Sequence, residues 1–388
     1  GFVQRAATRG GFAGFLAATA NRLSVFYNKW DTFLPAPVEQ SLLTNLLPDP
    51  TGTGKDYGVM LPLWGGKLVV RYNQYETLQL NSRTGDAGII ATRAGRIDFA
   101  YAGNNDSFNL QRVLNENIRN EPTWATASTE AISAEIAKRM GIEPDILARM
   151  NAFPVRETSD VTSKGKEIEL NYNPTRNYTL KVTVAEQRVI EENVSPNIQK
   201  YIDSRLPVWQ NIKITTADGS QLDWFTSRWG SGGVPSDFLN SAVEAPYKLL
   251  RANEGKSKSQ IRRWRVNVAS SLKLGAFSDN AWFRNTTLIG AVRWEDKGSI
   301  GYYAFDNDPS SYDPDRPIYD KAHTYVDFGA SYSMKLMRDK VRMRVQLNVR
   351  NAFENGGLQP IGALPNGMIH SYRILDPRLV ILTTTFDF

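Results

Sequence analysis

Cysteine is absent from the 388 residues of this chain, and histidine occurs only twice, at His323 and His370. The lack of cysteine excludes disulfides, thiolate metal sites and cysteine nucleophiles. Two histidines far apart in the sequence leave little for histidine-based catalysis or for zinc binding. The carboxylates are scattered and form no recognisable acid–base motif. We therefore expect neither an enzymatic activity nor a cofactor.

Long apolar runs are missing as well. No stretch of about 18 apolar residues occurs, which excludes a transmembrane helix, and the mean hydropathy is −0.39. A transmembrane β-barrel is not excluded, because alternating lipid-facing and lumen-facing residues give a polar average. Nine Trp, sixteen Tyr and seventeen Phe are available for the aromatic belts of such a barrel. The net charge of +6 fits compositional drift or a lumen that attracts anions.

Three stretches resemble binding motifs only superficially. Residues 52–56 depart from the phosphate-binding loop at both diagnostic positions, so they predict a polar turn. Basic and aromatic residues alternate at 262–265, but strand alternation explains this stretch without nucleic acid. An oxygen-rich loop is a weak calcium candidate, although it lacks the Gly and Glu of an EF-hand loop. Its carboxylates are Asp306, Asp308, Asp313 and Asp315.

Apolar and polar residues alternate with a period of two in many segments, which predicts β-strands. In residues 341–350, one face is apolar and the other is basic. If this strand lies in a barrel, the apolar face contacts lipid and the arginines line the lumen. The apolar face consists of Val341, Met343, Val345, Leu347 and Val349. The predicted lumen-facing arginines, here and on the similar segment 263–272, are Arg263, Arg265, Arg342, Arg344 and Arg350.

Ten strands are predicted in this way, and their connections alternate between short and long. The faces of 57–64, 67–79 and 280–299 are ambiguous, since Trp282 and Arg284 fall on one side of the last segment. Tight turns are expected near 64–67, 173–177, 275–279 and 336–339. Long connections are expected near 31–56, 80–164, 191–259, 300–321 and 353–375. Outer-membrane barrels show this rhythm because short turns face the periplasm and long loops face outward.

The long connections also contain helix signals. Ser195-Pro196 predicts a helix start with Ser at the cap and Pro at the first position. Ile132, Ile136 and Met140 predict a short amphipathic helix that Gly141 closes. We expect small helices that pack on their own loop, and the alternative is a ligand lid or a docking site for a partner.

The chain ends inside a strongly alternating segment. Val380, Leu382, Phe386 and Phe388 share one face and end on an aromatic carboxyl terminus. Most soluble domains end in a frayed polar tail, whereas the last strand of a closed barrel must pair and face lipid. This ending also resembles the insertion signal that the barrel-assembly machinery recognises.

Residues 325–388 resemble the C-terminal end of a TonB-dependent outer-membrane transporter. The stretch 346–353, QLNVRNAF, is similar to the penultimate strand of that family, and Asp376-Pro-Arg378 is similar to the opening of its last strand. Residues 166–180 also resemble barrel hairpins of large members. Ala352 stands where Leu is common.

The resemblance implies an all-β fold, with about ten C-terminal strands of an expected 22-stranded transmembrane antiparallel barrel. Residues 1–20 are then an interior connecting segment, rather than a signal peptide, and 21–388 the C-terminal part of the barrel. The plug domain and the TonB contact would lie outside this chain. The implied function is import of a scarce ligand across the outer membrane of a Gram-negative bacterium, with no bond made or broken. Siderophore, cobalamin, metal complex and glycan stay open.

Two other classes also stay open. One is a porin or surface-binding barrel without TonB coupling. The other is a soluble β-rich binding module or carbohydrate-active enzyme. A plug and TonB box encoded upstream would favour the transporter over both.

Deletion of Phe388 tests the insertion signal. Loss of one interfacial ring should reduce the free energy of unfolding by only about 1.5–3 kcal/mol, even if its burial is complete. We expect a much larger loss of assembly in cells, with refolding in detergent nearly intact. The measurements are surface exposure in cells and thermal stability in vitro of the full-length gene product. Equal losses in both assays would show that Phe388 is only a packing residue.

Overall fold

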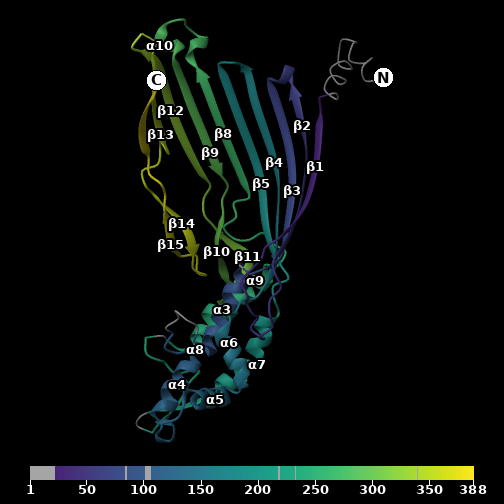
Figure 1. Ribbon diagram of the computed structural model, residues 1–388, viewed down its shortest axis with the longest axis vertical. Helices are drawn as coiled ribbons and strands as arrows, with labels where there is room; N and C mark the ends of the chain where they lie inside the picture. Colours follow the sequence, from purple (N-terminus) through teal and green to yellow (C-terminus); the bar gives the residue numbers. More distant parts are fainter. Residues whose placement is uncertain (1–21, 84, 101–105, 217–218, 232, 339) are drawn as a thin grey trace, which may run out of the picture.

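Ten antiparallel strands form one continuous curved sheet (Figure 1). The computed structural model describes residues 22–388 except 84, 101–105, 217–218, 232 and 339, so the predicted connecting segment 1–20 lies outside the described residues. All ten predicted strands are confirmed. They are β1 (Ser24–Phe33), β2 (Thr51–Leu63), β3 (Leu68–Ser82), β4 (Ser159–Thr175), β5 (Tyr178–Glu192), β8 (Trp264–Lys273), β9 (Thr286–Glu295), β12 (His323–Leu336), β13 (Val341–Arg350) and β16 (Leu379–Asp387).

The sheet is open, as expected for an incomplete barrel. Neighbours in the sheet follow the order of the chain from β1 to β16, and within the described residues these two strands are its edges. Short turns join strands at the upper end in Figure 1, and all long connections leave from the lower end. The predicted alternation of short and long connections is therefore confirmed. The long connections span 34–50, 83–158, 193–263, 296–322 and 351–378.

Three of the long connections contain a β-hairpin of their own. The strands pair as β6 (Lys213–Thr215) with β7 (Gln221–Asp223), β10 (Ser299–Phe305) with β11 (Asp308–Tyr319), and β14 (Leu358–Ala363) with β15 (Ile369–Ile374). The last two hairpins extend beyond the lower end of the sheet in Figure 1.

Two local predictions were wrong. Residues 52–56 are not a polar turn but belong to β2, where Gly54 leaves room for the Trp30 ring of β1: an added Cβ would lie 2.2 Å from that ring. The predicted strand 280–299 begins only at Thr286, because α10 (Ala281–Arg284) precedes it. Trp282 and Arg284 therefore belong to a helix, which removes the ambiguity of the strand's faces.

The register separates an apolar face from a polar face. Residues opposite each other in an antiparallel pair point to the same side. Val345 lies opposite Tyr332 and Thr384, whereas Arg344 lies opposite Ser333 and Thr385. Extended across all ten strands, the register places on the apolar side Val25, Val59, Tyr72, Ile168, Val184, Val266, Val292, Val326, Val349 and Val380.

Aromatic rings lie at both ends of the apolar face. At the short-turn end, Tyr172 makes edge contacts with Trp64 and Tyr178, with ring centroids 6.0 and 6.5 Å apart. At the long-loop end, the register places Tyr27 and Tyr57 opposite each other. Such rings are favoured where an apolar surface meets water and lipid head groups.

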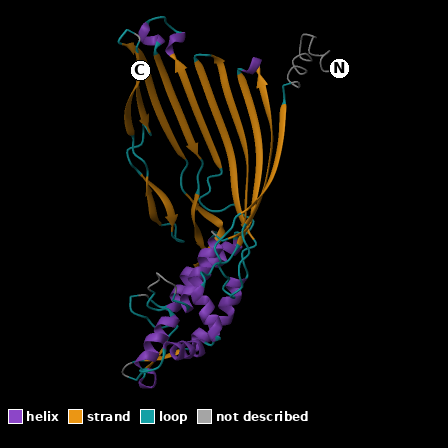
Figure 2. Cartoon of the chain, in the orientation of Figure 1, coloured by secondary structure: helices purple, strands orange, loops and turns teal. Residues whose placement is uncertain are grey.

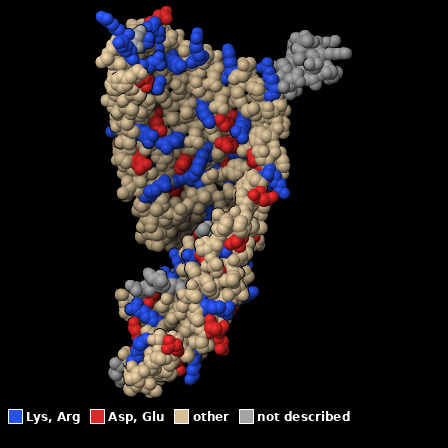
Figure 3. All heavy atoms as spheres, viewed as in Figure 1, with Lys and Arg blue, Asp and Glu red and all other residues tan. Residues whose placement is uncertain are grey.

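The polar face is hollowed and charged. Figure 3 shows Lys, Arg, Asp and Glu side chains across the face of the sheet turned to the viewer. At the short-turn end a recess of about 1090 Å³ is lined by Arg342, Arg344, Lys335 and Asp387, among others. The contrast between the two faces is that of a barrel wall with a lumen on one side.

The hydrophobic core does not lie on the sheet but in a helical body beyond its long-loop end (Figure 2). Two long connections, 83–158 and 193–263, supply nearly all of the helices. They are α3 (Asp86–Asp98), α4 (Leu110–Asn120), α5 (Thr129–Met140), α6 (Pro144–Ala152), α7 (Asn197–Asn211), α8 (Pro235–Phe238) and α9 (Ala245–Ala252), together with the 3₁₀-helix η2 (Pro122–Trp124) and the π-helix η3 (Leu239–Glu244). Buried residues of both connections form one cluster.

One buried carboxylate joins the helices of the two connections. Asp98, at the end of α3, is fully buried and accepts hydrogen bonds from side chains on one face of α7. The donors are Tyr201 Oη at 2.5 Å, Arg205 Nε at 2.7 Å, Arg205 Nη2 at 2.9 Å and Trp209 Nε1 at 2.8 Å. Arg205 also donates to the Met140 carbonyl at the end of α5, at 2.8 Å. The charge of Asp98 is thus paired and fully hydrogen-bonded, as burial requires.

The helix predictions were partly right. The helix at 132–140 is confirmed as α5, and Gly141 closes it with φ 67°. The helix after Ser195-Pro196 exists, but Pro196 is the cap rather than the first helical residue, and Ser195 Oγ accepts from the Asn197 N–H at 3.3 Å. Packing of each helix on its own loop is wrong, because α3 and α7 share one core. No helix among the described residues is both long and apolar enough to span a bilayer.

Substitution of Val345 by Arg tests the assignment of the faces. An Arg on the lipid side near mid-membrane should cost about 2–4 kcal/mol of folding stability. Arg344→Gln, one position away on the polar face, is the matched control and should cost far less. Spin labels at 343 and 344 in bilayers report the environment of each face. Water at both positions would mean that this strand is not in a membrane.

Candidate ligand-binding recess

The polar face carries a cluster of charged and aromatic side chains at the long-loop end of β8, β9 and β12. The register places Arg265, Glu295 and His323 in one transverse row. The next row contains Asn267, Arg293 and Tyr325. These positions follow from strand alternation, which brings every second residue of three neighbouring strands to the same side.

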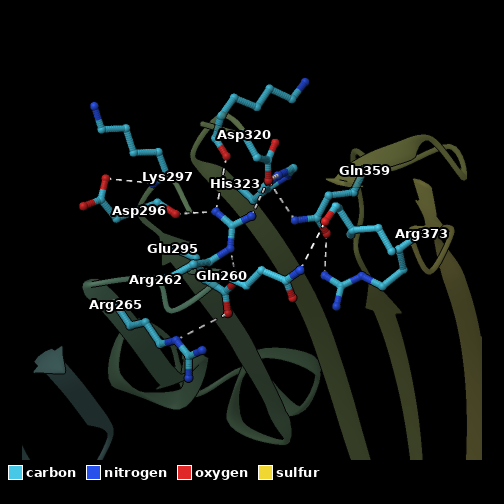
Figure 4. A network of polar contacts seen from close by, with 12 residues as sticks. Gln260, Arg262, Arg265, Glu295, Asp296, Lys297, Asp320, His323, Gln359 and Arg373 are labelled. Carbon is cyan, nitrogen blue, oxygen red and sulfur yellow. Dashed lines mark hydrogen bonds and ion pairs between the residues drawn. The ribbon is translucent and has the colours of Figure 1, made fainter. Parts of the chain in front are cut away.

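Asp320 joins three of the long connections just beyond this end of the sheet (Figure 4). Its Oδ2 accepts a hydrogen bond from Gln359 Nε2 at 2.9 Å and lies 2.9 Å from His323 Nε2. It also forms an ion pair with the Arg262 guanidinium. Arg262, Asp320 and Gln359 lie in the connections 193–263, 296–322 and 351–378, so a single carboxylate links all three.

The network continues on both sides of Asp320. Arg373 of β15 donates to the Gln359 side-chain oxygen, which orients the amide. Arg262 Nε lies 3.5 Å from Glu295 Oε2, and Arg265 Nε lies 3.8 Å from Glu295 Oε1. The chain of contacts therefore links the β14–β15 hairpin to the sheet (Figure 4).

The Asp320 side chain is almost fully buried, and burial by itself raises the pKa of a carboxyl group. Hydrogen bonds from its donors outweigh burial, so the pKa of Asp320 lies below its usual value. The carboxylate is therefore charged over the physiological pH range.

Beside this network lies a recess of about 290 Å³ on the polar face. Arg293 contacts Asp327 Oδ2 at 3.4 Å and Asn351 Oδ1 at 3.0 Å, and its guanidinium lies 5.4 Å from the centroid of the Tyr325 ring. Arg373 reaches the same recess from the hairpin. The remaining lining residues are Glu295, Ile374, Leu375 and Asp376. Two guanidinium groups beside a tyrosine ring provide donors for anionic oxygen atoms and a flat surface for stacking.

The predicted lumen-facing arginines lie at different places. Arg265, Arg342, Arg344 and Arg350 occupy the polar side by register. Arg263 precedes β8, and its guanidinium contacts Glu186 at 2.6 Å, a residue that lies opposite Trp264 on the other side. The recess brings together none of these five; its arginines, Arg293 and Arg373, were not predicted. Alternation marks the face of Arg293, but nothing in the sequence shows that β15 approaches it.

The weak calcium candidate does not form a cluster. Asp306 pairs with Arg316 at 2.8 Å, and Asp315 pairs with Lys256 at 2.6 Å. Asp313 accepts from the Asp315 N–H at 2.9 Å. No group of three or more His, Asp or Glu side chains suited to a metal ion occurs in the part of the chain that the structure describes. The predicted insertion-signal residues Val380, Leu382, Phe386 and Phe388 are all exposed.

Comparison with known proteins finds similarity in structure only. No family profile and no curated protein matches the chain. Among solved structures, the chain is similar to the pyoverdine outer membrane receptor FpvA from Pseudomonas aeruginosa (14% identity, TM-score 0.45, covering 95% of this chain and 34% of that one). It is also similar to BauA, the ferric preacinetobactin receptor from Acinetobacter baumannii (11% identity, TM-score 0.46, covering 95% and 34%). A third is the ferric-catecholate import receptor Fiu from E. coli (11% identity, TM-score 0.42, covering 94% and 33%).

The chain spans about a third of the length of these solved structures. We therefore infer its function from its own residues.

Replacement of Asp320 by Asn tests the link between the three connections. Asn at position 320 removes the closer of two carboxylates that contact the buried Arg262 guanidinium and leaves Glu295 at 3.5 Å. The loss of stability should therefore lie below the value of about 3–5 kcal/mol that a fully unpaired buried charge costs. We expect faster amide hydrogen exchange in the β14–β15 hairpin. Asp306→Asn, at an exposed ion pair, is the control and should leave exchange there unchanged.

The same link predicts the pH dependence of exchange in the hairpin. A carboxyl group whose pKa is lowered by folding contributes stability above its unfolded pKa, about 3.9 for Asp. That stability is lost as the pH falls through the lowered pKa of the folded state. The protection factor of the hairpin amides, which corrects for the pH dependence of intrinsic exchange, should therefore fall below about pH 4 in wild type, and the Asn variant should lack this fall. Identical exchange in wild type and variant at neutral pH would contradict the role of Asp320.

Proposed function

We propose that this chain forms part of the barrel of a TonB-dependent transporter, which imports a scarce ligand across the outer membrane of a Gram-negative bacterium. The observation that carries the proposal is a ten-stranded sheet with one apolar face and one hollowed, charged face. All its long connections lie at one end. Soluble proteins rarely expose a continuous apolar surface of this extent, whereas here no other element covers the apolar face among the described residues.

The recess at Arg293, Tyr325 and Arg373 supports binding of the ligand on the lumen side. Its guanidinium groups favour a ligand with anionic oxygen atoms, such as a ferric chelate, over a neutral glycan. Two of the nearby carboxylates, Glu295 and Asp327, are engaged by arginines, which reduces their repulsion of such a ligand. Import requires that the ligand later leave the site, and the resemblance implies that energy for release comes through a plug and TonB outside these residues.

The lipid bilayer and the barrel-assembly machinery are the other expected partners. Ten strands alone leave two open edges, which hydrocarbon does not tolerate. We therefore propose that further strands complete the barrel at β1 and β16. A soluble, monomeric preparation of residues 1–388 without detergent would count heavily against this proposal.

Uptake measurements test the proposed function. Cells that express the complete gene product are supplied with labelled ferric catecholate and hydroxamate chelates, cobalamin or oligosaccharides. We expect uptake of one ligand class that ceases when the inner-membrane proton gradient is dissipated. Arg293→Gln with Arg373→Gln should weaken binding of that ligand at least about tenfold, since each lost hydrogen bond to a charged group contributes about 1.5–3 kcal/mol.

Arg112→Gln is the matched control, because Arg112 is an exposed residue of α4 that pairs with Glu116. It should leave uptake unchanged. Uptake that persists without the proton gradient would instead indicate a porin.

A further inference from the structure

A basic groove lies on the apolar side of the sheet, just beyond the apolar band at the long-loop end. It has a volume of about 240 Å³ and lies across β3, β4 and β5. We define the basic groove by the six outward side chains that line it: Gln74, Glu76, Lys164, Lys166, Glu186 and Arg188. The register confirms their common side, because Glu76, Lys164 and Arg188 form one transverse row and Gln74, Lys166 and Glu186 the next.

The basic groove directly adjoins apolar surface. The next row toward the short-turn end consists of Tyr72, Ile168 and Val184. This arrangement suits an amphiphilic molecule. Its apolar chain can contact the apolar band, and its head group can contact the cations of the groove. A sheet face in contact with water would not require a row of cations directly beside a row of apolar side chains.

The charges in the groove are unbalanced. Glu76 is engaged by Lys55 at 3.3 Å, and Glu186 by Arg263 at 2.6 Å and Arg188 at 3.1 Å. Lys164 and Lys166 are exposed, and no ion pair or side-chain hydrogen bond of either lysine occurs among the described contacts. Lys29 lies directly opposite Lys55 in the row that continues the groove across β1 and β2. Like charges in such positions destabilise a sheet, and Glu76 neutralises only one of these two lysines, since it pairs with Lys55.

We propose that the basic groove binds the phosphate-bearing head group of an outer-leaflet lipid, whose acyl chains lie along the apolar face of β3–β5. This inference rests on the proposed function, which places the apolar face in a membrane and the long loops outside. Phosphate oxygens match ammonium and guanidinium donors in charge and geometry. The groove also lies inside the strand order, away from the edges at β1 and β16, so strands added there would not cover it.

The test uses the complete gene product in phosphatidylcholine nanodiscs with or without lipid A, a phosphorylated glycolipid. Retained lipid A is measured by native mass spectrometry after exchange, and thermal stability is measured in the same discs. The variant is Lys164→Gln with Lys166→Gln. Lys181→Gln is the matched control, because Lys181 lies on the polar side of β5 opposite Asn171 and pairs with Glu169 at 2.8 Å.

We expect wild type to retain lipid A and to be stabilised by it. Each removed charge should weaken retention about fivefold, the effect of one basic residue near an anionic lipid surface, so the double variant should retain it about 25-fold less. Higher salt should weaken retention in wild type as well. The control should behave as wild type, and all three proteins should have equal stability in discs without lipid A.

Equal retention by wild type and the double variant would overturn the inference while leaving the transporter proposal intact. Equal stabilisation by inorganic phosphate alone would also overturn it, since the groove would then bind free anions rather than a lipid. Failure of the wild type to enter nanodiscs at all would overturn the proposed function itself. Binding of a soluble protein at the groove in place of lipid A would likewise contradict the inference.

Discussion

A hydrogen-bond register that continues across ten strands, with shifts near the ends of β3 and β4, is the constraint on which the rest of this structure depends. It pairs the backbone groups within the sheet, and it places every second residue on the same side over the whole width. The apolar band, the basic groove and the strand residues of the charged recesses are consequences of that placement. A slip of one residue in any strand would exchange its two faces and bring charge into the apolar band.

The helical body is stabilised by a buried core rather than by the register of the sheet. Its two long connections leave the sheet through different strand pairs, yet they fold around one core and meet at the buried Asp98. A charge buried this deeply is tolerated because it accepts four hydrogen bonds, two of them from the Arg205 guanidinium. The sheet, by contrast, buries little within the chain: its outward residues such as Val25, Leu382 and Phe386 are exposed. The two parts therefore obtain their stability from different environments, protein interior in one case and, as we propose, lipid in the other.

The three connections around Asp320 lie between these parts. They bring Gln359 and Arg373 from a distant hairpin to the ends of β9 and β12, and the recess with Arg293 and Tyr325 forms beside them. On the polar side, the recess at Arg293 is therefore formed by loop and strand residues together. On the apolar side, the proposed lipid contact is formed by strand residues alone. Loops can vary without changing the register, which allows such a scaffold to serve different ligands.

The sequence by itself determined the ten strands, the faces of seven of them and the alternation of short and long connections, because a period of two is local. In the segments 57–64, 67–79 and 280–299 the pattern was too mixed to assign the faces. The C-terminal alternation and helix α5 with Gly141 were also readable, since their signals lie within a few residues of each other. Only the tertiary structure decided that Lys55 lies in a strand, that α10 shortens β9, and that α3 and α7 share a core. The groupings at Asp98, Asp320 and Arg293 unite residues from distant segments, and such contacts leave no periodic pattern in a single sequence.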